Sequence, residues 1–214
     1  MNIFVNSAGP LLAALGTTVM MAVIAGVAAI VLGTLITAAR VSPIPVLRGL
    51  AFAYVQFFVN VPLLVLLVLA VFALPDAGLL LPLTPTAIIV LALYEAAYVA
   101  EAVRSGVNTV GAGQIEASRA LGFTLVQSLR LIVVPQALRA AVQPIGNVMI
   151  ALTMNTALAA AVGVVELTSE ANKLNLVQAQ PILIFTVAGL IYMVLALAIG
   201  LGAGRIEKRV AIKR

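Results

Sequence analysis

The sequence Glu116-Ala-Ser-Arg-Ala-Leu-Gly122, with Val134-Pro-Gln-Ala137 shortly after it, is a polar interruption in the middle of a very apolar chain. Of the 214 residues, 64% are hydrophobic and 9% are charged. A soluble domain has about 25% charged residues, so this chain has too little polar surface to face water over most of its length. Both sides of the interruption are therefore expected to lie in lipid, and the interruption itself is expected to lie outside the membrane.

Apolar runs long enough to cross a bilayer, which takes about 20 helical residues, lie on both sides of this segment. There are five of them, at residues 11–39, 47–74, 85–103, 144–165 and 181–203. The sequence predicts an all-α integral membrane protein with five transmembrane helices that form a single domain over residues 1–214. The residues before the first run have no positive charge, so we expect that run to stay as a helix and not to be removed as a signal peptide.

The basic residues follow mainly the first, third and fifth runs. If the N-terminus lies outside, eleven of the 12 Lys and Arg residues are cytoplasmic, as the positive-inside rule requires. The predicted topology has the N-terminus outside, the C-terminus in the cytoplasm, and the polar segment between helices three and four in the cytoplasm. This distribution explains the net charge of +5, so no nucleic-acid partner is expected.

Composition excludes several kinds of chemistry. The chain has no Cys and no His, which excludes disulfides, thiol catalysis, Cys/His zinc sites and imidazole catalysis. It also lacks a Gly-x-x-x-x-Gly-Lys-Ser/Thr phosphate loop, so it cannot itself be a P-loop ATPase. We expect no catalytic, metal or cofactor site in this chain, and predict that it is not an enzyme.

The polar segment has the pattern of a helix, a sharp turn and a second helix. Residues 114–121 are expected to be helical, and Gly122 can take the positive φ that ends a helix. Residues 123–134 are expected to form the second helix, capped by Thr124 and limited by Pro135.

Small side chains are expected to be exposed at the bend, where they let another protein approach closely: Ala117, Ser118 and Ala120. Glu116 is expected near the N-terminus of the first helix, where the helix dipole favours its charge. From the residues alone, this segment is either a docking site for a cytoplasmic protein or a connector without a partner.

Residues 116–122 (EASRALG), with 133–139 (VVPQALR) downstream, resemble the EAA motif of ABC importer permeases. Residues 94–106 (YEAAYVAEAVRSG) and 113–117 (GQIEA) are similar to the polar amino-acid branch of that family. Further matches extend the resemblance over nearly the whole chain: residues 60–64 (NVPLL), 138–147 (LRAAVQPIGN) and 163–167 (GVVEL).

The resemblance implies a complex of several chains. Two permease subunits, identical or related, would form the pathway as multi-pass proteins of the bacterial plasma (inner) membrane. Two separate ATPase subunits would bind ATP and Mg²⁺, and an extracytoplasmic binding protein would deliver the amino acid. Residues 40–43 (RVSP) and 202–213 look most like glutamate-type permeases, which implies glutamate or glutamine as the substrate.

The same resemblance implies that each ATPase grips a coupling loop over residues 105–140. It assigns this contact to Glu116, Ala117, Ser118, Ala120 and Gly122. Glu116 would meet basic or polar groups of the ATPase, Ala117 would allow close contact, and Gly122 would make the bend.

Polar residues inside the apolar runs are candidates for the transport pathway. A carboxyl group such as Glu95, near the middle of the third run, is costly in a membrane unless it faces a cavity or a partner. It either contacts substrate in the pathway or is protonated or paired within the bundle. In the second run, Pro62 is expected to break or gate the helix, and Asn60 either satisfies the freed backbone or lines the pathway. A polar cluster in the fourth run either lines the pathway or bonds between helices; it comprises Thr153, Asn155 and Thr156.

Two departures from the family bear on the substrate. Relatives often have an Arg before the Asn or Gly of the segment that is Val59-Asn-Val-Pro62 here, and a Lys at the position of Met154. Both positions are apolar in this chain and Glu95 adds a carboxyl group, so a neutral or cationic amino acid is an alternative substrate. Two alternatives of other classes remain, a self-sufficient small channel or secondary carrier and a membrane scaffold without transport.

Overall fold

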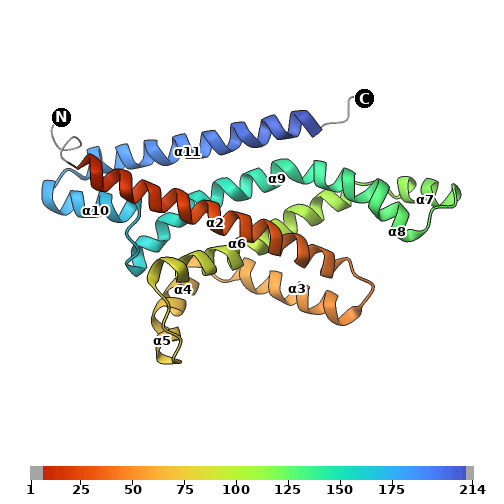
Figure 1. Cartoon of the computed structure of the whole chain (residues 1–214), viewed down its shortest axis with the longest axis horizontal. Helices are drawn as coiled ribbons and strands as arrows, with labels where there is room; N and C mark the ends of the chain where they lie inside the picture. The colour runs from red at the N-terminus through yellow and green to blue at the C-terminus, as the bar shows by residue number, and fades with distance from the viewer. Residues whose placement is uncertain (1–6, 211–214) are drawn as a thin grey trace.

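The computed structural model describes residues 7–210, and every regular element in that range is helical (Figure 1). Four helices are long and apolar enough to cross a membrane on their own: Ala8–Arg40, Leu83–Asn108, Val126–Val162 and Pro181–Val210. Pro45–Asn60 and Leu63–Asp76 meet the same criterion only as a bent pair, which makes up to five spans. The predicted all-α membrane class is confirmed, whereas the sidedness stays a prediction. Residues 1–6 and 211–214, with the predicted outer N-terminus and the last two basic residues, lie outside the described range.

In chain order the helices are α2 (Ala8–Arg40), α3 (Pro45–Asn60), α4 (Leu63–Val68), η1 (Leu69–Ala73), α5 (Leu74–Asp76), α6 (Leu83–Asn108), α7 (Ala112–Ala120), α8 (Leu125–Ser128), η2 (Leu129–Val133), α9 (Val134–Asn155), η3 (Thr156–Val162), α10 (Leu167–Gln178) and α11 (Pro181–Val210). The elements η1 and η2 are wide π-helical turns, and η3 is a tighter 3₁₀ helix. Because all three continue a neighbouring α-helix directly, they change the path of a long helix without ending it.

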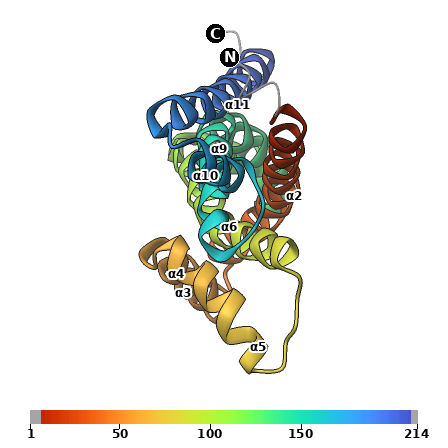
Figure 2. The same cartoon turned by 90° about the vertical axis from the view of Figure 1, so that its left-hand side faces the viewer.

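The central helix of the bundle is α6, which packs against α2, α3 and α9 (Figure 1 and Figure 2). Small side chains on α6 let its neighbours approach closely. The alanines buried there include Ala92, Ala96, Ala97 and Ala100. By contrast, α11 lies against α9 and leaves most of its apolar surface exposed, so in a bilayer it faces lipid or another chain.

The tightest approach of α2 to α6 is at Gly33. A Cβ atom added to Gly33 would lie 2.6 Å from Val99 Cβ and 2.7 Å from the carbonyl oxygen of Ala96. Neither atom can move without moving α6, because one is a backbone atom and the other is the first atom of a side chain. The packing of the two helices therefore depends on the missing side chain at this position.

Replacing Gly33 with alanine is expected to force α2 away from α6 and to lower the free energy of unfolding by about 1–3 kcal/mol, as overpacking of a filled core does. The measurement is the thermal unfolding midpoint of the purified protein in detergent. Gly16→Ala is the matched control on the same helix, because a Cβ there meets nothing within 4 Å. Equal midpoints for the two variants would contradict the close packing of α2 on α6.

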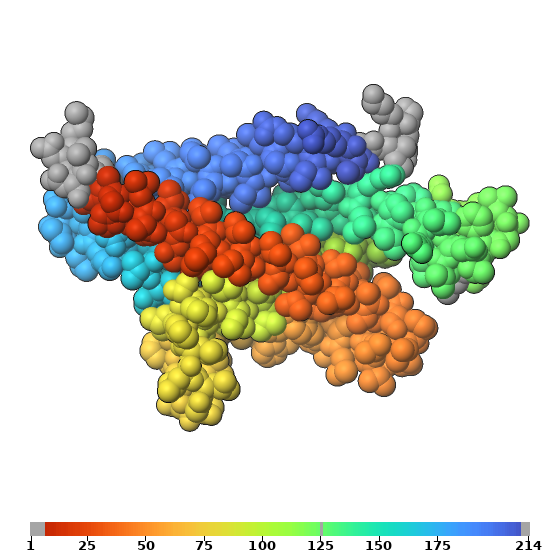
Figure 3. Space-filling model, in the orientation of Figure 1, coloured from red at the N-terminus to blue at the C-terminus, as the bar shows by residue number. Residues whose placement is uncertain are grey.

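The helix of the second apolar run, residues 47–74, is broken near its middle, where Pro62 was expected to break or gate it. Val61 and Pro62 are both extended, with ψ of 131° and 132°, and the helices on either side of them meet at 100°. Proline has no N–H to continue the helix, and it disfavours the helical conformation of the residue before it. The helix break expected at Pro62 is present, and the two pieces can still make up one bent span. The first piece, α4, packs on α6, whereas α5 projects from the bundle (Figure 1 and Figure 3).

The connector expected between residues 104 and 143 is much shorter in the structure. The helix α6 continues to Asn108, and one continuous helix covers Val126–Val162. Pro135 was expected to limit the second helix, but it lies in the first turn of α9, directly after the π-helical turn η2. The wider turn accommodates a proline that would otherwise clash with the preceding turn, as happens in membrane helices. That expectation about Pro135 is wrong.

Basic residues gather at one end of the bundle. The C-terminal ends of α2, α6 and α11 lie at the same end of the bundle as α7 (right in Figure 1). Basic residues in the last turns of these elements include Arg40, Arg119, Lys208 and Arg209. One end of the bundle is thus basic, which is the arrangement that the positive-inside rule associates with a cytoplasmic face.

Candidate functional site

The α7–α8 segment, residues 112–128, stands at this basic end and has the predicted order of helix, turn and helix (Figure 1). Gly122 has φ of +84°, and its N–H donates to the carbonyl of Arg119 at 2.9 Å. The N–H of Thr124 donates to Gln127 Oε1 at 2.8 Å, while Thr124 Oγ1 accepts from the N–H of Gln127 at 3.3 Å. This reciprocal pair starts the second helix in the manner of a capping box.

The exposure of the small residues at the bend is partly as expected. Glu116, Ala117 and Ala120 are exposed, as a docking surface requires. Ser118 is 1% exposed and its Oγ lies 2.6 Å from Ser128 Oγ, so the prediction that Ser118 is exposed is wrong. Its side chain lies on the face of α7 that packs on α8, and it fixes the angle between the two helices.

Glu116 was expected near the N-terminus of its helix. Because α7 begins at Ala112, two residues earlier than expected, Glu116 lies in the second turn and the first turn has no acidic residue. The helix dipole therefore contributes little to its placement. What the segment presents is an exposed carboxyl group beside small side chains.

Glu95 is buried in the membrane region, with 1% of its surface exposed. Asn155 Nδ2 donates a hydrogen bond of 2.7 Å to Glu95 Oε1, which joins α6 to α9. The two residues belong to a cavity of about 360 Å³, here called the Glu95 pocket, lined by Tyr94, Glu95, Tyr98, Asn147, Val148, Ala151 and Asn155. Tyr94 and Tyr98 share a hydrogen bond of 3.1 Å between their hydroxyl groups. Carboxyl, amide and phenol groups thus converge in one pocket, and its lining includes no basic side chain.

The other predicted pathway residues lie elsewhere. Thr153 and Thr156 are buried, and their hydroxyls donate to the carbonyls of Met149 at 2.9 Å and of Thr153 at 2.7 Å. Asn60 is exposed, and its Nδ2 donates to the carbonyl of Gln56 at 2.7 Å, within its own helix. The structure brings together Glu95 and Asn155 but places none of these three residues in the Glu95 pocket.

A second buried carboxyl group belongs to Glu166, which directly follows the fourth apolar run. It is 0% exposed in the structure. Its Oε1 accepts from the N–H of Ser169 at 2.7 Å, and its Oε2 accepts from Tyr192 Oη at 2.7 Å. Thr18 Oγ1 accepts from the N–H of Leu167 at 3.1 Å, next to this cluster. Glu166 therefore joins the start of α10 to α11, beside α2. In the sequence, the sign of a polar partner for it was Tyr192, a tyrosine inside the last apolar run.

Replacing Glu166 with glutamine is expected to lower the free energy of unfolding by about 1–3 kcal/mol. The amide nitrogen of glutamine cannot accept, so either the N–H of Ser169 or the hydroxyl of Tyr192 loses its acceptor. The measurement is the thermal unfolding midpoint in detergent. Glu170→Gln is the matched control, since this residue lies in the first turn of α10, which Glu166 caps, and its one salt bridge among the described residues is with Lys173 at 3.2 Å. The role of Glu166 would be refuted by a midpoint no lower than that of the control.

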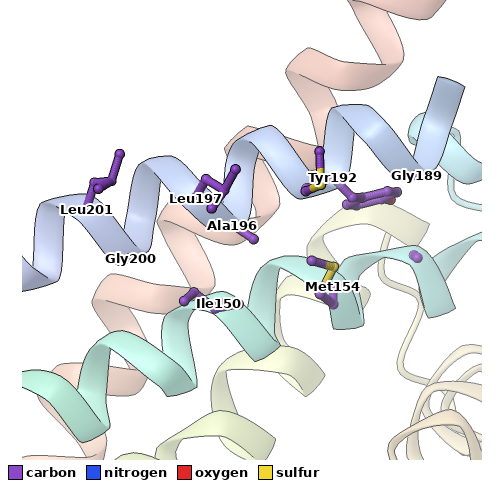
Figure 4. Close-up of a pocket in the computed structure, with 10 residues that line it drawn as sticks. Ile150, Met154, Gly189, Tyr192, Ala196, Leu197, Gly200 and Leu201 are labelled. Carbon is purple, nitrogen blue, oxygen red and sulfur yellow. The ribbon is translucent and has the colours of Figure 1, made fainter.

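Other cavities are less suited to a polar solute. A groove of about 620 Å³ runs between α9 and α11, with Ile150 and Met154 on one side and Ala196 and Leu197 on the other (Figure 4). Its one polar side chain is Tyr192, whose hydroxyl already bonds to Glu166. Within residues 7–210, no group of three His, Cys, Asp or Glu side chains is placed to hold a metal ion.

Comparisons with known proteins agree over nearly the whole chain. The family model described as "Binding-protein-dependent transport system inner membrane component" matches residues 29–212. The glutamate transport system permease protein GluC of Corynebacterium efficiens is 38% identical to this chain, over 96% of each. The probable glutamine ABC transporter permease protein GlnM of Bacillus subtilis is 34% identical, over 90% of this chain and 89% of that one.

Two solved structures have the same architecture. A chain of an amino acid ABC transporter crystallised with histidines superposes with a TM-score of 0.91 at 27% identity, over 96% of each chain. A chain of the MetNI methionine ABC transporter in an inward-facing conformation superposes with a TM-score of 0.79 at 25% identity, over 97% of this chain and 99% of that one.

Proposed function

Because the chain belongs to the family of binding-protein-dependent transport system inner membrane components, we propose that it is a permease subunit of an ATP-driven amino-acid importer. The observation that carries this proposal is the full-length similarity, in sequence and in structure, to permeases of amino-acid ABC transporters. A polar pocket buried between two spans, with a carboxyl group that has no basic side chain beside it, is the feature of the chain that a solute pathway needs.

In this proposal the energy comes from separate chains. Two ATPase subunits bind ATP and Mg²⁺ on the cytoplasmic side, and a second permease subunit, identical or related, completes the pathway. An extracytoplasmic binding protein delivers the amino acid. The absence of a phosphate loop from the sequence and the exposed helix–turn–helix at the basic end both support this division.

The α7–α8 segment is the proposed contact with the ATPase. Glu116 offers an exposed carboxyl group for pairing, and Ala117 and Ala120 let the partner surface approach. Ser118 and Gly122 set the arrangement of α7 relative to α8. Ser118 does so through its hydrogen bond to Ser128, and Gly122 through its positive φ. Because α8, η2 and α9 form one continuous helix, a movement of this segment is transmitted directly to Asn155 and the Glu95 pocket.

The Glu95 pocket is the proposed place of substrate contact. An amino acid has an ammonium group, for which Glu95 and the oxygen of Asn155 are suitable partners. The similarity to GluC and GlnM favours glutamate or glutamine as the substrate. A carboxyl group in a pocket without a basic side chain favours a neutral or cationic amino acid over glutamate. Glutamine is compatible with both observations, and a cationic amino acid is the second candidate.

The proposed location is the bacterial plasma (inner) membrane, with the N-terminus outside and the basic end in the cytoplasm. The test is reconstitution of the chain in liposomes with the ATPase, the binding protein and the second permease subunit. Uptake of labelled glutamine, glutamate, arginine and histidine is then measured with and without ATP. We expect uptake only when ATP and all partners are present. Uptake by the purified chain alone would instead identify a self-sufficient channel or carrier.

A further inference from the structure

Three arginines from different elements meet in a cavity at the basic end of the bundle. The cavity has a volume of about 510 Å³ and is lined by Arg40, Pro45, Arg48, Gly49, Phe52 and Arg104, here called the basic pocket. Arg40 is the last residue of α2, Arg48 lies in the first turn of α3, and Arg104 lies in the last turns of α6. Neither the transport pathway nor the α7–α8 segment uses any of these side chains.

The positive charge of this pocket is only partly balanced. Glu101 accepts from Arg104 Nε at 3.0 Å and also pairs with Arg40, so one carboxyl group serves two guanidinium groups. Within the part of the chain that the structure describes, Arg48 forms no salt bridge. A guanidinium group has five N–H donors, so each of the three arginines has donors left for a further acceptor. The pocket thus has three positive charges against one negative charge.

The geometry of the pocket is held by packing. The side chain of Arg40 is 11% exposed, and its guanidinium carbon lies 5.6 Å from the centre of the Phe52 ring, a cation–π contact. Arg40 is therefore fixed before any ligand arrives, and its remaining donors do not have to be ordered on binding. A preorganised arginine is well suited to a planar or tetrahedral oxyanion.

The surroundings of the pocket are apolar and exposed. Ile44, Leu47 and Phe52 are 52%, 43% and 52% exposed, in the N-terminal half of α3 and at its N-cap, near Arg48. A ligand that fits this place has an anionic group for the arginines and apolar chains for this face of α3. Basic pockets between membrane helices at the cytoplasmic side bind such headgroups. We propose that the basic pocket binds the phosphate group of an anionic phospholipid, with the acyl chains lying along α3.

The test uses the full-length chain purified in a neutral detergent and depleted of lipid. Retention of phosphatidylglycerol, of phosphatidylcholine and of inorganic phosphate is measured by native mass spectrometry. We expect wild-type protein to retain phosphatidylglycerol and not phosphatidylcholine. Arg48→Gln is expected to lower this retention about fivefold, the effect of one basic residue near anionic lipid. Arg205→Gln, at an exposed arginine of α11 outside the pocket, is the matched control and is expected to match wild type.

Each other outcome overturns the proposal in a recognisable way. Equal retention of the two lipids would mean that the pocket does not select charge. Equal losses in Arg48→Gln and Arg205→Gln would mean that lipid follows net charge and not this pocket. Retention of inorganic phosphate without lipid would make the site one for a free anion. Arg48→Lys checks whether the loss in Arg48→Gln comes from the missing charge or from misfolding. Because lysine keeps the positive charge, this variant is expected to retain more lipid than Arg48→Gln but less than wild type.

Discussion

Replacing Gly122 with valine is expected to lower ATP-dependent uptake at least tenfold while the transmembrane helices remain folded. Gly122 has φ of +84°, a conformation that costs an L-residue roughly 1–2 kcal/mol and is worst for β-branched side chains. A Cβ at this position meets nothing within 4 Å, so the effect comes from the backbone and not from crowding. Valine therefore opens the turn and swings α7 away from the position that an ATPase would meet. The measurements are uptake in proteoliposomes and co-purification of the ATPase.

Two further variants separate the turn from the surface it presents. Gly122→Asn is the rescue control, because asparagine tolerates positive φ, and it is expected to keep most of the uptake. Glu116→Lys leaves the turn intact and reverses the exposed charge, so it is expected to reduce co-purification of the ATPase with no change in thermal unfolding. Normal co-purification and uptake in both Gly122→Val and Glu116→Lys would remove the α7–α8 segment from the proposed coupling.

Replacing Glu95 with glutamine is expected to lower uptake of a neutral or cationic amino acid at least tenfold. Glutamine keeps the shape of the side chain and can still accept the hydrogen bond from Asn155, now 2.7 Å from Glu95 Oε1. What it removes is the ionisable carboxyl group that can pair with the ammonium group of a substrate, and a loss of about 1.4 kcal/mol in binding corresponds to a tenfold change in affinity. The measurement is uptake of labelled amino acids, with ATPase co-purification and thermal unfolding as checks that the complex still assembles.

The sign of this effect depends on the substrate. If the imported amino acid is glutamate, removal of a carboxyl group from the pocket is expected to raise its uptake, because a repulsion is relieved. Glu95→Asp is the control for charge, since it keeps the carboxyl group and only shortens the side chain. Wild-type uptake of every amino acid by Glu95→Gln would show that Glu95 is not part of the substrate site.

Much of the fold was predictable because the apolar composition of membrane helices identifies them in a sequence. Runs of apolar residues have one stable form in lipid, a helix with its own backbone hydrogen bonds, so each long run predicted a helix correctly in kind. The turn at Gly122 was also predictable, because a glycine between two helical patterns can take the positive φ that ends the first helix. The break at Pro62 was recognised as a kink, but its angle of 100° was not, because a proline limits the backbone without fixing its direction.

The candidate site was harder to predict. Glu95, Asn155, Thr153 and Thr156 all presented the same signal, a polar residue in an apolar run. Only Glu95 and Asn155 meet, and the two threonines satisfy their hydroxyls within their own helix. Glu166 was overlooked because its position after the fourth run looked like an ordinary loop, although it is completely buried.

By itself, the sequence determined that this protein is a helical membrane bundle with a polar helix–turn–helix at its basic end. It also contained the motifs that relate it to ABC importer permeases. The tertiary structure alone decided which polar groups face each other, that Ser118 is buried against Ser128, and that three arginines converge beside α3. The physical reason is that lipid solvates every face of an apolar helix equally well, so the sequence of such a helix carries little information about which face packs inward. The partners of Glu95 and Glu166 depend on which face of each helix packs inward, and this is established only when the helices are assembled.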